Sequence, residues 1–159
     1  MRRRWKAALA GAGAALLVAT VGALMTDLGP WYGSLRQPAW KPPDALFGPA
    51  WTIIFALAAI AGVRAWLRAP TRSERDLIVI AYLANGFLNV LWSLLFFRLQ
   101  RPDWALIEVA LLWISILFVI VTVRRHSRLS AWLLVPYLAW VSFAAALNWV
   151  VVELNRPFS

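Results

Sequence analysis

Five long apolar stretches constrain this chain more than any other feature of its sequence. A bilayer core about 30 Å thick is spanned by roughly 20 mainly apolar residues in a helix. Five segments reach that length: about 5–25, 46–67, 77–97, 104–123 and 131–152. In hydrocarbon, backbone amides must be satisfied within their own segment, so each stretch is expected to be helical. The sequence therefore predicts an all-α, integral membrane bundle of five transmembrane helices, a single domain over residues 1–159.

Composition agrees with a membrane protein and excludes several other classes. Of the residues, 62% are hydrophobic and 14% are charged, against about 45–50% and about 25% in soluble domains. The chain has no cysteine, which excludes disulfides and thiolate metal sites. The net charge is +9, but the arginines lie between apolar stretches rather than on one basic face, so we expect no nucleic-acid partner. The sequence also lacks a metal-ligand cluster and a hydrolase motif, so we expect neither a metal site nor an obligatory cofactor.

The basic residues predict the orientation, because flanking Lys and Arg are retained in the cytoplasm. Eleven of the 16 fall on one side: Arg2, Arg3, Arg4, Lys6, Arg64, Arg68, Arg72, Arg75, Arg124, Arg125 and Arg128. The other side holds Arg36, Lys41, Arg98, Arg101 and Arg156. We therefore expect a cytoplasmic N-terminus in a bacterial cytoplasmic membrane, with the outer membrane as the alternative. The first stretch also resembles a secretory signal, but its apolar run is longer than the usual signal core, which favours an uncleaved helix.

The segment between the first two stretches, residues 26–44, is too long and too aromatic for a simple connector. It contains four prolines, which restrict its freedom, together with Trp31, Tyr32 and Trp40. Long loops in compact proteins are usually functional or disordered. We interpret this one as a lid over the end of the bundle, the alternative for its tryptophans being an interfacial aromatic belt.

Three of the predicted helices each place aromatic side chains and small or amide side chains on one face. These faces are Trp51, Phe55, Ala58 and Gly62; Asn85, Asn89, Trp92 and Phe96; and Trp140, Ala144 and Asn148. Together they favour a cavity for a large, flat, mostly apolar ligand with a few polar edges. The alternative is that the asparagines only join helices. Glu108, about one turn into the fourth stretch, is expected to be an interfacial carboxylate, the alternative being a functional one.

Four segments resemble the TspO/MBR family of tryptophan-rich sensory proteins and translocator proteins, which includes the peripheral-type benzodiazepine receptor. They are Trp31-Tyr32-x-x-Leu35-x-x-Pro38-x-Trp40-x-Pro42-Pro43, Pro49-Ala50-Trp51-Thr52, Asn89-x-x-Trp92-Ser93-x-x-Phe96-Phe97 and Pro136-Tyr137-Leu138-Ala139-Trp140. The resemblance implies a five-helix membrane protein, commonly a homodimer, that binds porphyrins such as protoporphyrin and haem. It also implies that Tyr32, Trp51, Asn89 and Trp140 line the pocket, with Ala139 at its edge.

The resemblance and the faces together predict the site and the function. The candidate ligand-binding residues are Tyr32, Trp40, Trp51, Asn89, Trp92, Phe96, Ala139, Trp140 and Asn148. We expect a porphyrin-binding sensor or regulator of tetrapyrrole metabolism and stress response, the carboxylates of its ligand directed towards Arg36 or Lys41. One alternative is a light-dependent protoporphyrin-degrading enzyme, in which Trp51, Trp140 and Tyr32 take a photochemical part. The other is a transporter of porphyrins or sterol-like molecules. We do not expect high-affinity cholesterol binding, because residues 147–156 contain no tyrosine for the sterol-recognition segment.

Overall fold

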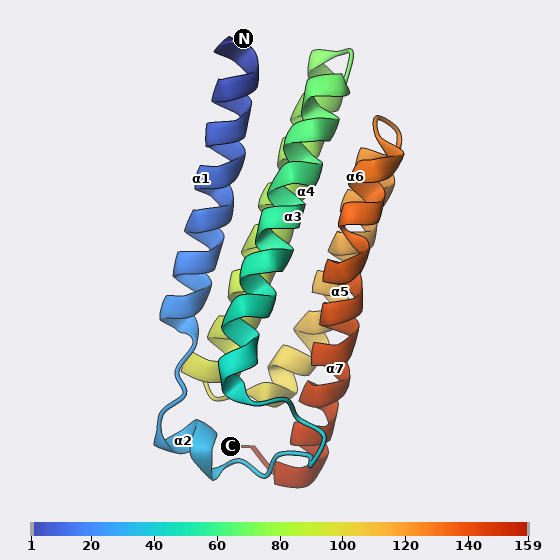
Figure 1. The fold of residues 1–159 in the computed structure, drawn as a ribbon. Helices are drawn as coiled ribbons and strands as arrows, with labels where there is room; N and C mark the ends of the chain where they lie inside the picture. The colour runs from blue at the N-terminus through green and yellow to red at the C-terminus, as the bar shows by residue number, and fades with distance from the viewer. Residues whose placement is uncertain (1, 159) are drawn as a thin grey trace.

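The computed structural model describes residues 2–158, which form a bundle of helices with no strand in that range (Figure 1). The long helices are α1 (Arg2–Met25), α3 (Phe47–Arg68), α4 (Arg72–Ser93), α5 (Pro102–Arg124) and α7 (Val135–Asn155). Shorter elements are α2 (Pro30–Ser34), α6 (Arg128–Leu133), the 3-10 turn η1 (Asp44–Leu46) and the π-helical turn η2 (Leu94–Arg98). Five helical stretches are long and apolar enough to cross a bilayer. The predicted all-α, five-span membrane fold is therefore confirmed.

Helix α4 begins at Arg72, five residues before the apolar run suggested. Thr71 caps this end, since its hydroxyl accepts a hydrogen bond from the backbone N–H of Glu74 at 3.2 Å. In return the Glu74 carboxylate accepts one from the backbone N–H of Thr71 at 3.1 Å. This reciprocal capping box satisfies two helix-end donors. The helix therefore extends beyond the segment that hydrophobicity alone marks.

The last span is two helices rather than one. Helix α6 ends at Leu133, and α7 starts at Val135 with Pro136 in its first turn. Proline has no backbone N–H and clashes with the preceding helical turn, so a continuous helix is unfavourable at this point. The break lies less than two turns before Trp140 and so helps to set the direction in which α7 presents that side chain.

Helix α5 packs against both α4 and α7. Its inner face includes Ala105, Leu112 and Ile116, all buried. Helix α1 is peripheral: it packs on α3 and α4, and none of its residues from Arg2 to Met25 is buried. Large apolar side chains such as Phe87 and Ile107 point outward, as expected for surfaces that face lipid.

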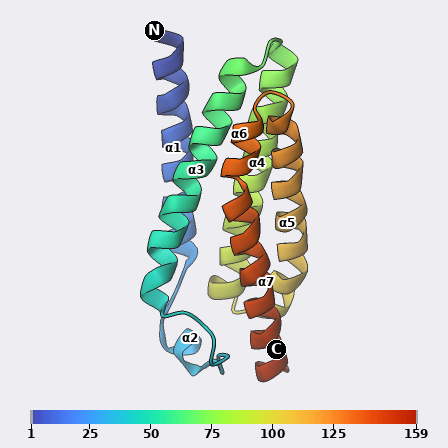
Figure 2. The ribbon, with the colours of Figure 1, turned by 45° about the vertical axis from the view of Figure 1, so that its right-hand side comes forward.

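The two ends of the bundle differ. The N-terminus, the α3–α4 turn and the α5–α6 turn lie at one end, whereas α2, the α5 N-terminus and the C-terminal segment lie at the other (Figures 1 and 2). The first end carries the eleven basic residues grouped by the sequence, and the second carries the other five. The predicted orientation requires this separation of basic residues between the two ends. Which end lies in the cytoplasm stays a prediction.

Candidate ligand cavity

A cavity of about 570 Å³ lies inside the bundle near the end that carries α2. Side chains from α1, α3, α4, η2, α5 and α7 line it, and the segment between α1 and α3 contributes Leu28, Tyr32, Gln37 and Asp44. Its volume falls within the range of about 300–1,000 Å³ typical of small-molecule sites. The segment predicted as a lid therefore lies against the bundle and forms part of the cavity wall.

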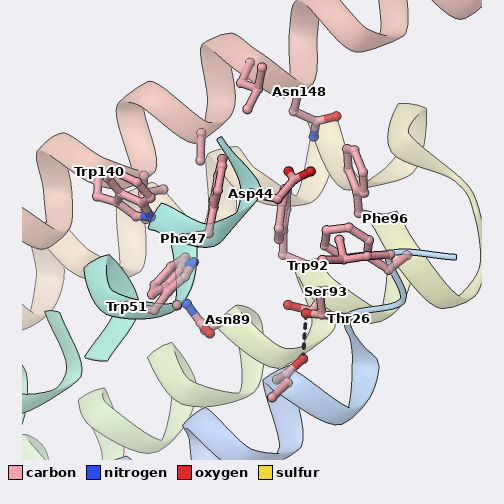
Figure 3. A pocket seen from close by; sticks show the side chains of 18 of the residues that line it. Thr26, Asp44, Phe47, Trp51, Asn89, Trp92, Ser93, Phe96, Trp140 and Asn148 are labelled. Carbon is pink, nitrogen blue, oxygen red and sulfur yellow. Dashed lines mark hydrogen bonds between the residues drawn. The ribbon is translucent and has the colours of Figure 1, made fainter. Parts of the chain in front are cut away.

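Aromatic side chains form two opposing walls of the cavity (Figure 3). On one side, Trp51 stacks on Phe55 at a centroid distance of 5.2 Å and meets Trp140 edge-on at 6.5 Å. On the other side, Trp92 stacks on Phe96 at 5.2 Å. Helix α3 and helix α7 supply the first wall, whereas α4 and η2 supply the second. A flat apolar molecule between the walls would contact ring surfaces on both of its faces.

A buried chain of hydrogen bonds fixes the polar part of the cavity. The Asn89 amide donates to the Tyr137 hydroxyl at 3.1 Å, and that hydroxyl donates to the Asn85 carbonyl oxygen at 3.2 Å. Asn85 in turn donates to Ser115 at 2.9 Å. These hydrogen bonds join α4, α5 and α7. Asn85 therefore joins helices, which is the alternative stated for the asparagines in the sequence analysis. Asn89 does this as well, but it also lines the cavity, where its amide oxygen is available to an occupant.

A second polar group lies in the loop at the mouth of the cavity. The Lys41 ammonium donates to the Tyr32 hydroxyl at 2.9 Å and forms an ion pair with Asp44. The Tyr32 hydroxyl donates to the same Asp44 carboxylate at 2.8 Å. Partial burial raises the pKa of Tyr32 above its ordinary value, so the phenol stays neutral at physiological pH. Burial alone lowers the pKa of Lys41, but the hydrogen bonds to Asp44 and Tyr32 outweigh it and hold that pKa above its ordinary value.

This arrangement corrects one expectation about the ligand's carboxylates. Lys41 is already paired with Asp44. Arg36 is an exposed residue and lies outside the cavity lining. Its backbone N–H donates to the Asn155 amide oxygen at 2.8 Å. Neither cation therefore faces the cavity as a free partner for a carboxylate.

Seven of the nine candidate ligand-binding residues line the cavity: Tyr32, Trp51, Asn89, Trp92, Phe96, Trp140 and Asn148. Trp40 does not; it is 50% exposed and packs on Phe143 at a centroid distance of 5.7 Å. Ala139 is also exposed, because it precedes Trp140 by one residue and so points about 100° away around the helix. The shared faces thus meet at one cavity, while one loop tryptophan and the edge alanine lie outside its lining.

Asn148 has a structural partner in addition to its place in the lining. With its amide oriented to satisfy both neighbours, it donates to the Pro102 carbonyl and accepts from the Leu106 N–H, each at 3.0 Å. These groups belong to the first turns of α5. Asn148 therefore joins α7 to α5.

The sequence did not mark several residues of the cavity wall. Gln37 and Asp44 reach it from the loop, and Phe47 reaches it from the start of α3. Tyr137 lies outside the lining but links Asn85 with Asn89; it belongs to the family segment Pro136–Trp140 and was not among the predicted site residues. A buried tyrosine usually needs a partner for its hydroxyl, and that rule was the available signal for Tyr137. The loop residues gave no comparable signal, because their direction depends on how the loop folds.

Glu108 corrects another expectation. It is 5% exposed rather than solvated at the interface, since it lies on the inner face of α5 between Ala105 and Leu112. Both of its carboxylate oxygens are buried, and neither has a hydrogen-bond partner among residues 2–158. The position of Glu108 near the start of α5 suggested that its carboxylate lies at the membrane interface. The side chain is buried instead, because it lies on the inner face of that helix.

Comparison with known proteins matches the TspO/MBR family model to residues 10–154. The chain is 38% identical to the tryptophan-rich protein TspO of Chlorobaculum tepidum, over 79% of each chain. It is 35% identical to protein CrtK of Rhodobacter capsulatus, over 80% of this chain and 79% of that one. It is 30% identical to the human translocator protein, over 79% of this chain and 75% of the human one.

Proposed function

This chain is a member of the TspO/MBR family of integral membrane proteins, and we propose that it is a membrane sensor or regulator that binds a porphyrin or related tetrapyrrole in the cavity. The observation that carries the proposal is the pair of aromatic walls, Trp51 with Trp140 and Trp92 with Phe96, on opposite sides of one space. A tetrapyrrole is flat, large and mostly apolar. Two ring walls suit both of its faces, and the name of one relative, "Tryptophan-rich sensory protein", supports the sensory role.

Binding between the walls would draw on dispersion and on removal of apolar surface from water. Each well-placed aromatic contact contributes about 0.5–1.5 kcal/mol beyond the area it buries. The amide oxygen of Asn89, whose N–H donates to Tyr137, would accept one hydrogen bond from a polar edge of the ligand. No acid or base is needed for this function, since a sensor or regulator only has to bind.

The test is titration of the purified protein with protoporphyrin in the dark, following tryptophan fluorescence. We expect saturable quenching in the parent protein and about threefold to tenfold weaker binding for Trp51→Phe and Trp140→Phe, the range that one aromatic contact provides. Trp132→Phe is the matched control, because Trp132 is 70% exposed and lies outside the cavity lining. Equal affinity in all four proteins would show that the cavity is not the binding site.

The same sample under illumination separates binding from degradation. Edge-on indoles 6.5 Å apart place two oxidisable side chains beside any occupant, which is the observation that favours a light-dependent enzyme as second candidate. A stable porphyrin absorption band in light would identify a binding protein. Loss of the band in the parent but not in Trp51→Phe would identify degradation at this site.

A further inference from the structure

The charges around the cavity are unusual for a site that takes a dicarboxylate. Among the described residues that line it, the formally charged side chain is Asp44, an acid rather than a base. Lys41 neutralises this carboxylate and also donates to Tyr32. A ligand carboxylate that entered the cavity would therefore meet a paired carboxylate and no uncommitted lysine or arginine in the lining.

Such a carboxylate would lose much of its hydration without gaining a cation in exchange. Moving an ionised carboxylate out of water costs far more than moving a neutral polar group, unless a cation or several donors replace the water. Charged groups are excluded even more strongly at membrane depth. The cavity should therefore bind the ionised form of a ligand at least about tenfold more weakly, the value of one hydrogen bond to a charged group.

Neutral hydrogen-bonding groups in the lining lack partners instead. Both polar atoms of the Gln37 amide and the Trp140 indole nitrogen are buried with no hydrogen-bond partner among residues 2–158. Both side chains line the cavity, Gln37 from the loop and Trp140 from α7. Phe47 packs edge-on against the Trp140 ring at a centroid distance of 5.6 Å. These neutral donors can replace the weak hydration of an ester carbonyl oxygen, but they cannot replace the hydration of an ionised carboxylate.

Resting on the proposed function, we propose that the cavity selects tetrapyrroles whose side-chain carboxyl groups are esterified, with Gln37 and Trp140 as the donors to the ester carbonyls. Gln37 is then a specificity-determining residue, because it occupies a lining position where a cation would favour the free acid. Its amide donates a hydrogen bond and adds no charge to the lining.

The test compares protoporphyrin with its dimethyl ester, two ligands with the same ring and different charge. We expect the parent protein to bind the ester at least tenfold more tightly than the diacid. Gln37→Lys should reverse or abolish that preference, because it adds a cation that faces the cavity. Ala39→Lys is the matched control: it adds the same charge in the same loop at an exposed residue outside the lining. Comparing the ester-to-diacid ratio between variants in the same micelles cancels the different partition of the two ligands into detergent.

A second variant keeps the test independent of how well a buried lysine is tolerated. Gln37→Met has a similar length and no donor, and it leaves the charge unchanged. It should weaken ester binding about twofold to tenfold, the value of one net hydrogen bond, and leave diacid binding unaltered.

The outcomes separate this inference from the proposed function. Failure of both porphyrins to bind the parent protein would overturn the proposed function itself. Binding of both, with the diacid equal or tighter, would overturn only the inference, since the carboxylates must then lie outside the cavity or find a cation. An equal change of ratio in Gln37→Lys and Ala39→Lys would also overturn it, because the effect would then be one of net charge.

Discussion

The Tyr137 hydroxyl links two asparagines of α4, because it accepts from Asn89 and donates to Asn85. Tyr137→Phe leaves both amides without this partner inside the bundle. A buried polar group left unpaired costs about 1–3 kcal/mol, so we expect the thermal midpoint in detergent to fall by several degrees. Tyr82→Phe is the matched control, since the Tyr82 hydroxyl donates one hydrogen bond, to the Ala58 carbonyl. A smaller loss in Tyr137→Phe than in Tyr82→Phe would contradict the role assigned to the chain of hydrogen bonds.

Glu108 gives a prediction of the opposite sign. Both carboxylate oxygens are buried without partners among the described residues, so an ionised side chain there is unfavourable. Glu108→Gln keeps the shape and removes the need to bury a charge. We expect a thermal midpoint equal to or above that of the parent, whereas Glu108→Lys should lower it strongly. A marked loss of stability in Glu108→Gln would indicate that the carboxylate has an ionic partner, such as a bound cation.

At the residue scale, periodicity predicted which side chains share a face but not which partners they find. Asn85 and Asn89 are one turn apart, and their spacing placed both on the inner face of α4. Their partners come from α5 and from α7, 30 to 52 residues further along the chain. Local sequence therefore placed the amides, and only the packing of distant helices decided that Asn85 joins helices while Asn89 also faces the cavity.

Close approach of α3 and α4 depends on Gly62. A Cβ atom at this position would lie 2.9 Å from Cζ of Tyr82, whose hydroxyl is held by the Ala58 carbonyl. Gly62→Ala therefore has to displace the ring or separate the helices, and we expect a lower thermal midpoint. Gly13→Ala is the control, because a Cβ there meets nothing within 4 Å, and alanine favours a helix interior by about 1 kcal/mol over glycine. Equal responses of the two variants would mean that the contact with Tyr82 is not limiting.

At the element scale, hydrophobic runs predicted every spanning helix, because the bilayer leaves the backbone few alternatives. They did not predict where helices extend or break. Helix α4 extends to Arg72 through a capping box. The last span breaks before Pro136, where the proline itself, not the apolar run, predicts a kink. The short helix α2 within the loop was not expected either. It packs on Phe96 and Phe97, and contacts between residues so far apart in the chain cannot be read from local sequence. The ends of helices thus depend on caps, prolines and tertiary contacts, which the average hydrophobicity of a segment does not reveal.

At the scale of the whole molecule, the cavity arises because aromatic faces of separate helices meet near one end of the bundle. The sequence predicted the faces of α3, α4 and α7, which lie far apart in the chain, but not the loop residues that line the cavity beside them. The ion pair of Lys41 with Asp44 was not predicted for the same reason. Lys41 and Asp44 are three residues apart, and whether they pair with each other or with a ligand depends on the turn between them.

The two unequal ends of the bundle carry the last prediction, which concerns its direction in the membrane. The end with the N-terminus holds eleven of the 16 basic residues, and flanking basic residues are retained in the cytoplasm. A reporter that fluoresces only in the cytoplasm should therefore be active when fused to the N-terminus and silent when fused to the C-terminus. The cavity, which lies at the α2 end, would then open towards the far side of the membrane, so its ligand would arrive from outside the cytoplasm or through the bilayer. An active C-terminal fusion with a silent N-terminal one would reverse the orientation, and with it the side from which the cavity is reached.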